Sequence, residues 1–321
     1  MSAVGADRPR SAARADRTPA GRPVQAAGRR REGPGRRRQW SGLWFVLPAL
    51  LLYGGLILYP AVRTLNLSLW RWDGVNQATW RGLANYADVV RDPVLRGSIL
   101  HAGVLIIFFC LVPVGLGLVW AALLTRRRVR GLALFRLVFF LPQILPLVAV
   151  GVIWRWMLAP QGMINQLLGW FGLDQGRAWL GEWDYALIAI GLIGAWVQSG
   201  LCMMLFMAGC GRIERELYEA ARLDGAGPWR EFWAVTWPGL RSEVGLALTV
   251  TVIAALASFD IVFVTTNGSP GHRTDVPGLL VYQRLVAGDL GHAAALAVVL
   301  SGLVLLAALA TSRLSRSGEE R

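Results

Sequence analysis

The chain has 321 residues, of which 55% are hydrophobic and 17% charged, and its formal net charge is +13. This composition excludes an ordinary soluble enzyme and a disordered chain, and it is typical of integral membrane proteins. All 33 Lys and Arg residues are arginine, so no Walker A loop with its lysine exists, and ATP hydrolysis at such a site is excluded.

Residues 1–39 form an N-terminal tail rich in Arg, Ala, Gly and Pro, without apolar periodicity. Such a segment cannot bury enough apolar surface to fold, so we expect it to be disordered. The run RRREGPGRRR suggests nucleic-acid binding at first sight. A topology signal that also attracts anionic lipid headgroups explains it better, and we expect no nucleic-acid partner.

Six apolar segments follow, each long enough to cross a hydrocarbon core of about 30 Å as a helix. The fold class we predict is therefore an all-α integral membrane protein with six transmembrane helices. Single prolines inside these segments are tolerated where neighbouring helices satisfy the backbone. The predicted spans are residues 42–62, 99–124, 137–158, 186–209, 244–265 and 292–312.

The arginines predict the direction of the chain across the membrane. The N-terminal tail, the 126–136 and 212–241 connections and the C-terminal tail (313–321) together carry 24 of the 33 arginines. Both termini and these two connections are therefore expected in the cytoplasm. The 63–98 connection, with five arginines, is the weakest point of this assignment.

The cytoplasmic connection between spans four and five, residues 213–240, is polar and interrupted by glycine and proline. Its first part predicts an amphipathic helix, because four apolar residues recur at the spacing of one helical face. The outward neighbours are mostly charged. The apolar face consists of Ile213, Leu217, Ala220 and Ala221.

The DGAG run at 224–227 ends this helix, since glycine takes a positive φ without a clash. Pro228 suits the first position of a second helix, where its missing N–H costs nothing. Aromatic residues at 229, 232 and 233 share one face of that helix, and Pro238 ends the segment. We therefore predict two short helices joined by a tight turn.

Two interpretations of this helix pair remain open. It could lie flat on the membrane with its aromatic residues among the headgroups. The first helix, however, carries Glu214, Glu216, Glu219 and Asp224, which an anionic leaflet repels. Docking of the pair into a groove of a cytoplasmic partner fits the charges better.

The segment EAARLDGAGPWREFWAVTWP resembles the EAA loop of ABC importer permeases, the inner-membrane components of binding-protein-dependent transport systems. The resemblance implies that this loop docks on an ATPase subunit and couples ATP hydrolysis to transport. It places six residues on the motif: Glu219, Ala220, Ala221, Asp224, Gly225 and Pro238.

Other segments extend the resemblance over most of residues 40–312, the expected transmembrane domain. FFLPQILPLVAVGVIWRWML followed by GMINQLL resembles the third span and the next loop of carbohydrate permeases. FDIVFVTTNGSPGHRT is similar to a segment of the maltose, glycerol-3-phosphate and lactose F/A-type permeases. One departure is Gly268-Ser269-Pro270, where the family usually has Gly-Gly-Pro.

The resemblance also implies partners. We expect a second, G-type permease as the other half of a heterodimer, two separate ATP-binding-cassette ATPase subunits, and an extracellular solute-binding protein. The transported solute is expected to be a carbohydrate or polyol derivative, and the lipid bilayer is the solvent. The resemblance implies no cofactor, no metal and no catalytic residue of this chain's own.

Polar side chains within the apolar spans are candidates for the translocation path. We single out Gln198 and Asp260 for this role. For glutamines within spans, interhelical hydrogen bonding is the alternative, and for Asp260 an outward-facing ion pair is the alternative.

No Ser/His/Asp or metal-binding spacing appears in the sequence. The three cysteines, 110, 202 and 210, all lie in apolar runs and are expected to be packing residues. A membrane enzyme is therefore disfavoured. An ATPase-independent secondary transporter or channel is the alternative function. Such proteins are expected to show inverted repeats with buried titratable residues or broken helices, whereas this chain shows a single EAA loop and few buried charges.

Overall fold

The structure is a computed structural model that describes residues 36–125, 130–173 and 176–316. Most of the predicted N-terminal tail and residues 317–321 lie outside the described residues, and the first helix begins at Arg36, earlier than the boundary expected after residue 39. In chain order the elements, with η for a π-helical turn, are α1 (Arg36–Tyr53), η1 (Gly54–Leu58), α2 (Tyr59–Leu67), β1 (Trp70–Arg71), β2 (Thr79–Trp80), α3 (Ala84–Arg91), α4 (Pro93–Ile106), η2 (Ile107–Leu111), α5 (Val112–Thr125), α6 (Leu132–Ile144), α7 (Leu147–Met157), α8 (Met163–Trp170), α9 (Ala186–Cys210), α10 (Arg215–Leu223), α11 (Pro228–Glu231), η3 (Phe232–Thr236), α12 (Trp237–Gly239), α13 (Arg241–Leu256), α14 (Asp260–Thr265), α15 (Pro277–Val286) and α16 (Leu290–Arg316).

The described residues fall into two units, one ending at Gly54 and one beginning at Gly55. α1 belongs to the first unit and the elements from α2 onward to the second. In the part of the chain that the structure describes, four helices are long and apolar enough to cross a membrane, and two bent helix pairs raise this number to six if each pair is one span. The four helices are Phe45–Leu67, Pro93–Leu124, Ala186–Cys210 and Leu290–Arg313. The structure is therefore mostly helical with four to six candidate membrane spans, as expected of an integral membrane protein.

Two of the expected spans are not single helices. The 137–158 segment is divided between α6 and α7, which are bent by 101°. Leu145 between them is extended, with ψ of 139°, because the ring of the following Pro146 disfavours helical backbone at the preceding residue. The bend therefore follows from the local sequence.

The 244–265 segment is also interrupted, because α13 ends at Leu256 and α14 begins at Asp260. No proline causes this break. The hydroxyl of Ser258 donates to the carbonyl oxygen of Ala255 at 2.6 Å, and such a local side-chain bond competes with the regular helix ladder. At its other end α13 is bent by 70° from the preceding helical segment Pro228–Gly239.

Three π-helical turns have a common origin in proline. η1, η2 and η3 end two residues before Pro60, Pro113 and Pro238, respectively. A proline inside a helix removes one backbone donor, and its ring clashes with the carbonyl of the preceding turn. A wider turn with i→i+5 bonds moves that carbonyl away. The helices therefore continue through these prolines without a sharp kink.

The core of the second unit is built around α9, which packs against α5, α6, η2 and α13. The close approach of α9 to its neighbouring helices depends on small residues at the contacts, as is usual between membrane helices. A side chain at Gly194 would overlap the ring of Phe109, and one at Gly117 would meet the backbone of Cys202 at 2.9 Å. All three cysteines are buried and unbridged, as expected for packing residues.

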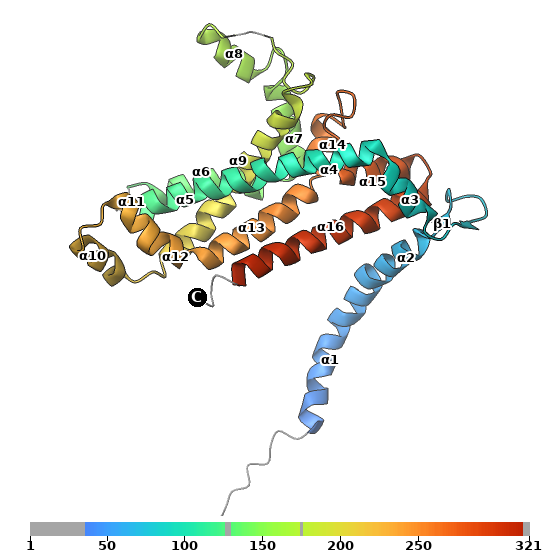
Figure 1. Ribbon diagram of the computed structural model, residues 1–321, viewed down its shortest axis with the longest axis horizontal. Coiled ribbons are helices and arrows are strands. Elements are labelled where there is room, and N and C mark those ends of the chain that lie inside the picture. The colour runs from blue at the N-terminus through green and yellow to red at the C-terminus, as the bar shows by residue number, and fades with distance from the viewer. Residues whose placement is uncertain (1–35, 126–129, 174–175, 317–321) are drawn as a thin grey trace, which may run out of the picture. The chain divides into compact units, whose positions relative to one another are not determined.

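The bundle of the second unit has two distinct ends (Figure 1). α10, α11 and α12 lie at the left of the view, where α13 begins and toward which the end of α16 points. α3 and β1 lie at the right. The 212–241 connection thus lies at one end, and the 63–98 connection lies at the other.

A small hairpin forms part of the 63–98 connection. β1 and β2 pair antiparallel, with Trp70 opposite Trp80 and Arg71 opposite Thr79. The turn between them is closed by the carboxylate of Asp73, which accepts bonds from the backbone N–H groups of residues 75 and 76 at 3.0 and 2.8 Å. These bonds stabilise the ionised form and lower the pKa of Asp73 to about 2.

Candidate functional site

The first feature of the candidate site is the two-helix loop. α10 carries Glu219, Ala220 and Ala221, and the second helical segment runs without interruption through α11, η3 and α12 to Gly239. Pro238 therefore does not end the segment as expected, because it lies within the helix behind the π turn η3. The segment ends one residue later, at Gly239.

Gly225 forms the turn between the two helices. Its φ is +78°, in the left-handed region that glycine enters without strain. The N–H of Ala226 donates to the carbonyl of Ala221 at 2.9 Å, and the N–H of Gly225 donates to the carbonyl of Arg222 at 3.0 Å. These two bonds make a Schellman motif, in which Asp224 is the C-cap residue of α10.

Polar contacts join the two helices. The guanidinium of Arg222 donates from Nε to Oε2 of Glu231 at 3.1 Å and from Nη2 to Oε1 at 3.4 Å. This hydrogen-bonded ion pair raises the pKa of Arg222. One helical turn away, the hydroxyls of Tyr218 and Thr236 lie 3.2 Å apart. Sequence reasoning missed both contacts, because nothing in the spacing indicates which side chains meet across a turn.

The base of the loop is fixed to α13. Arg212, before the loop, forms an ion pair with Glu243 in the first turn of α13. Ile213 packs against Gly239, where a Cβ would approach its side chain to 2.6 Å. Leu240, at the bend, is fully buried. A displacement of the loop would therefore move the start of α13.

The tip of the loop is open to its surroundings. Of the predicted apolar face of α10, Leu217 is 52% exposed and Ala220 is exposed, whereas Ile213 and Ala221 are half-buried. Leu223, at the end of the helix, is 89% exposed. The loop thus presents apolar side chains beside the exposed carboxylate of Glu219, which is the character of a docking surface.

The aromatic face of the second helix turns toward α5. Trp229, Trp233 and Trp237 form a chain of ring contacts, with centroids 5.8 and 5.6 Å apart. Together with Phe232 they line a groove of about 530 Å³, whose opposite wall is formed by apolar residues 115–123 of α5. The exposed tip of α10 and this aromatic groove are therefore made by different helices.

The second feature is a cavity of about 190 Å³ at the helix interruptions. Gln198 from α9 and Asp260 from α14 both line it, so the structure brings together the two residues singled out for the path. Gln198 is buried and Asp260 is exposed. The structure records no ion pair for Asp260 among the described residues.

Much of the remaining lining comes from interrupted elements. Phe109 lies in η2, Leu147 follows the break between α6 and α7, and Ser258 lies between α13 and α14. Sequence reasoning missed Ser258, because a serine near the end of an apolar run is common in membrane helices and gives no specific signal. Within the ranges that the structure describes, no three His, Cys, Asp or Glu side chains gather to hold a metal ion.

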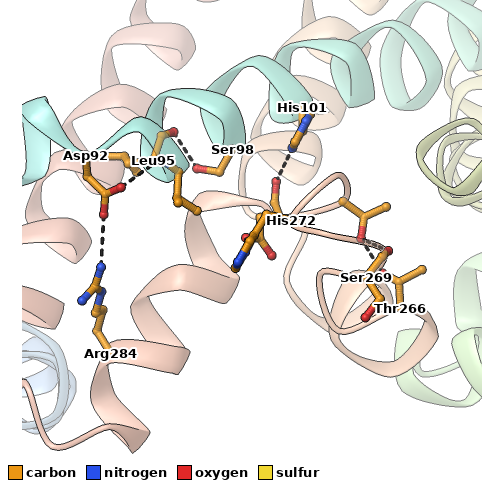
Figure 2. A network of polar contacts seen from close by, with 11 residues as sticks. Asp92, Leu95, Ser98, His101, Thr266, Ser269, His272 and Arg284 are labelled. Atoms are coloured by element: carbon orange, nitrogen blue, oxygen red, sulfur yellow. Dashed lines mark hydrogen bonds and ion pairs between the residues drawn. The ribbon is translucent and has the colours of Figure 1, made fainter. Parts of the chain in front are cut away.

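The loop after α14 forms a polar network with α4 and α15 (Figure 2). The buried carboxylate of Asp275 accepts a bond from Nδ1 of His272 at 2.6 Å, and His101 on α4 donates from Nδ1 to the backbone carbonyl of Asp275 at 3.0 Å. Arg284 on α15 pairs with Asp92, at the start of α4, at 3.1 Å. The loop is thus fixed to α4 by His101, and α4 is fixed to α15 by the Asp92–Arg284 pair.

The same network explains why Ser269 can stand where the family usually has the second glycine of its Gly-Gly-Pro pattern. Gly268 has a φ of +86°, and a side chain at this position would overlap the carboxylate of Asp275, so glycine is required there. Ser269 is not among the residues with positive φ; its N–H donates to Thr266 at 3.0 Å, and its carbonyl accepts from Thr274 at 2.8 Å. A serine therefore fits the second position without strain.

Comparisons with known proteins identify this arrangement. Residues 113–317 match the family model described as binding-protein-dependent transport system inner membrane component. The probable ABC transporter permease protein YurN of Bacillus subtilis is 32% identical over 282 residues, which cover 86% of this chain and 96% of YurN. The sulfoquinovosyl glycerol transport system permease protein SmoG of Agrobacterium fabrum is 33% identical, over 80% of this chain and 84% of SmoG.

A solved structure of similar fold is a bacterial ABC transporter involved in the import of the acidic polysaccharide alginate. It aligns with a TM-score of 0.74 at 20% identity and covers 88% of this chain and 96% of that chain. At this identity the likeness shows the fold alone. The sequence matches go further: the chain belongs to the family of binding-protein-dependent transport system inner membrane components, and it is a multi-pass permease of the cell membrane rather than an enzyme.

Proposed function

We propose that this permease is the F/A-type half of an ATP-driven importer that moves a carbohydrate or polyol derivative into the cell. It pairs with a second, G-type permease. Two ATPase subunits dock on the cytoplasmic side of this permease pair, and an extracellular solute-binding protein delivers the substrate. The relatives named for sulfoquinovosyl glycerol, diacetylchitobiose and lactose transport support this solute class.

The single observation that carries the coupling role is the construction of the two-helix loop. Its tip exposes Leu217 and Leu223 beside Glu219, while its base is fixed to α13 by the Arg212–Glu243 pair and by buried Leu240. An exposed apolar and acidic tip on a fixed base is suited to bind an ATPase subunit and to transmit its movement to α13.

The path from this loop to the cavity is one helix. α13 begins at the bend after the loop and ends at Leu256, directly before cavity residues 257–261. Its 16 residues span about 24 Å. Closure of the ATPase subunits would move the loop, and α13 would carry that movement to the residues around Gln198 and Asp260. The cavity then changes from inward-facing to outward-facing access.

We further propose six spans with both termini in the cytoplasm. The arginine distribution supports this, and so does the gathering of the 212–241 connection and the end of α16 on one side of the bundle. In this arrangement α6 and α7 form one span and α13 and α14 form another, whereas Pro228–Gly239 belongs to the cytoplasmic loop. The polar loop that contains Asp275 then lies outside, where the binding protein docks.

The test uses the assembled transporter in proteoliposomes. A cysteine at Ser258 reports on cavity access through its reaction with a membrane-impermeant maleimide, with and without ATP. We expect ATP to change the labelling rate, and we expect Glu219→Lys to remove both this change and co-purification of the ATPase, because electrostatic complementarity is lost. ATP-independent labelling of Ser258→Cys, together with ATP-independent transport by the unmodified protein, would instead indicate a secondary transporter.

A further inference from the structure

The turn at the tip of the two-helix loop is weakly supported by packing. Apart from the adjacent residues of the chain, no heavy atom of the described residues lies within 4 Å of the position that a Cβ would take at Gly225 or at Gly227. Glycine has the greatest backbone freedom of all residues. The angle between the two helices therefore depends on contacts made away from the turn.

The Arg222–Glu231 pair supplies one such contact. Glu231 is buried, with 4% of its side chain exposed, whereas Arg222 is 57% exposed. Arg222 lies in the last turn of α10 and Glu231 in the first turn of the second helix, so each charge also has the favourable sign for its helix end. With two hydrogen bonds, the pair fixes orientation as well as distance.

The π turn η3 adds a second contact on the same side. In an α-helix, residues five apart are rotated by roughly 140° from each other, so Glu231 and Thr236 could not both face α10. The N–H of Trp237 instead bonds to the carbonyl of Phe232, and this wider turn reduces the rotation between them. Thr236 thereby meets Tyr218, which precedes Arg222 by one helical turn on α10.

We propose that Arg222 and Glu231 are positioning residues that make the loop rigid enough to transmit force from the ATPase to α13. This inference rests on the proposed coupling function of the loop and goes beyond the motif residues that carry the family resemblance. Neither side chain needs to touch the ATPase. Their role is to keep the turn at Gly225 from bending when the ATPase closes.

The proposal predicts loss of coupling without loss of docking. In Arg222→Gln and in Glu231→Gln, we expect the ATPase to co-purify at the level of the unmodified protein. The ATP-dependent change in maleimide labelling of Ser258→Cys, measured per ATP hydrolysed, should fall about tenfold, the lower end of the range expected for hydrogen bonds to charged groups, because the exposure of Arg222 weakens the pair. The matched control Arg215→Gln removes an exposed arginine from the same helix and should leave both measurements unchanged.

The double variant Arg222→Gln/Glu231→Gln tests whether the two residues act as a unit. If they do, its loss of coupling equals that of either single variant, whereas independent roles would add. Distances between spin labels at positions 217 and 233 should spread over a wider range in all three variants. Pro238→Ala, which permits a regular α-helix, should weaken coupling in the same way by misplacing Thr236.

Two outcomes would overturn the inference. Unchanged coupling in both single variants would show that the turn is rigid without the pair. Loss of ATPase co-purification in them, as expected for Glu219→Lys, would place the pair in the docking surface itself. If the proposed coupling function of the loop is itself wrong, the result differs from both of these. Glu219→Lys would then leave ATPase co-purification and the ATP-dependent labelling of Ser258→Cys unchanged.

Discussion

Replacing Gly225 with valine tests most directly whether the two-helix loop transmits force. The φ of +78° at this position costs an L-residue about 1–2 kcal/mol, and the branched Cβ of valine is among the least suited to it. Because no neighbour lies within 4 Å of the added Cβ, the cost comes only from the backbone. It lowers the population of the formed turn by a factor of roughly 5–30.

We expect Gly225→Val to reduce ATP-dependent uptake severalfold in proteoliposomes that contain the assembled transporter. The loop lies outside the core that packs around α9, so membrane insertion and docking of the binding protein should remain normal. The assay follows uptake of the solute that co-purifies with the cognate binding protein, together with co-purification of the ATPase.

Gly172 offers a matched control. Its φ is +71°, its added Cβ also meets nothing within 4 Å, and the N–H of Leu173 bonds to the carbonyl of Leu168 at 3.1 Å in the same Schellman pattern. Gly172→Val therefore carries the same backbone cost at the end of α8. Normal uptake in Gly225→Val, or an equal loss in both variants, would refute the reasoning.

Four further predictions concern topology, energy source, path and packing. Reporter fusions after Arg130 and after Arg222 should both report a cytoplasmic location, and an external signal at either would reverse the orientation. The purified chain without ATPase subunits should hydrolyse no ATP, which a phosphate-release assay checks. Gln198→Ala and Asp260→Ala should each change uptake rate or apparent affinity; if neither does, the cavity they share is not on the path. Gly194→Val should lower thermal stability in detergent by about 1–3 kcal/mol, because its side chain overlaps a phenylalanine ring of η2.

The sequence was sufficient to predict elements whose signals are local. The 186–209 span corresponds closely to α9, because a long apolar run needs no other information. The turn at Gly225 was predicted for the same reason, since a DGAG run followed by proline allows few other conformations. The family resemblance supported these local signals and is confirmed by the comparisons.

The interruptions could not be predicted with equal certainty. Hydropathy averages over a window, so it treats 137–158 and 244–265 as continuous, although Pro146 was a visible signal for the first break. Nothing comparable indicates the break at Ser258, because serine is often tolerated within membrane helices. The Arg222–Glu231 contact was equally hidden, since the geometry of the turn and of η3 decides which side chains meet.

The features that hydropathy misses are the ones that surround the cavity. Phe109 in η2, Leu147 after the first break and Ser258 in the second contribute to its wall, and each lies where a regular helix ladder is disturbed. Irregular backbone at membrane depth is tolerated only where protein buries it or where it lines an aqueous cavity. An interruption inside an apolar span therefore indicates a path more directly than an isolated polar residue does. By this argument Asp260, placed just after such a break, is a stronger candidate than its charge alone would make it.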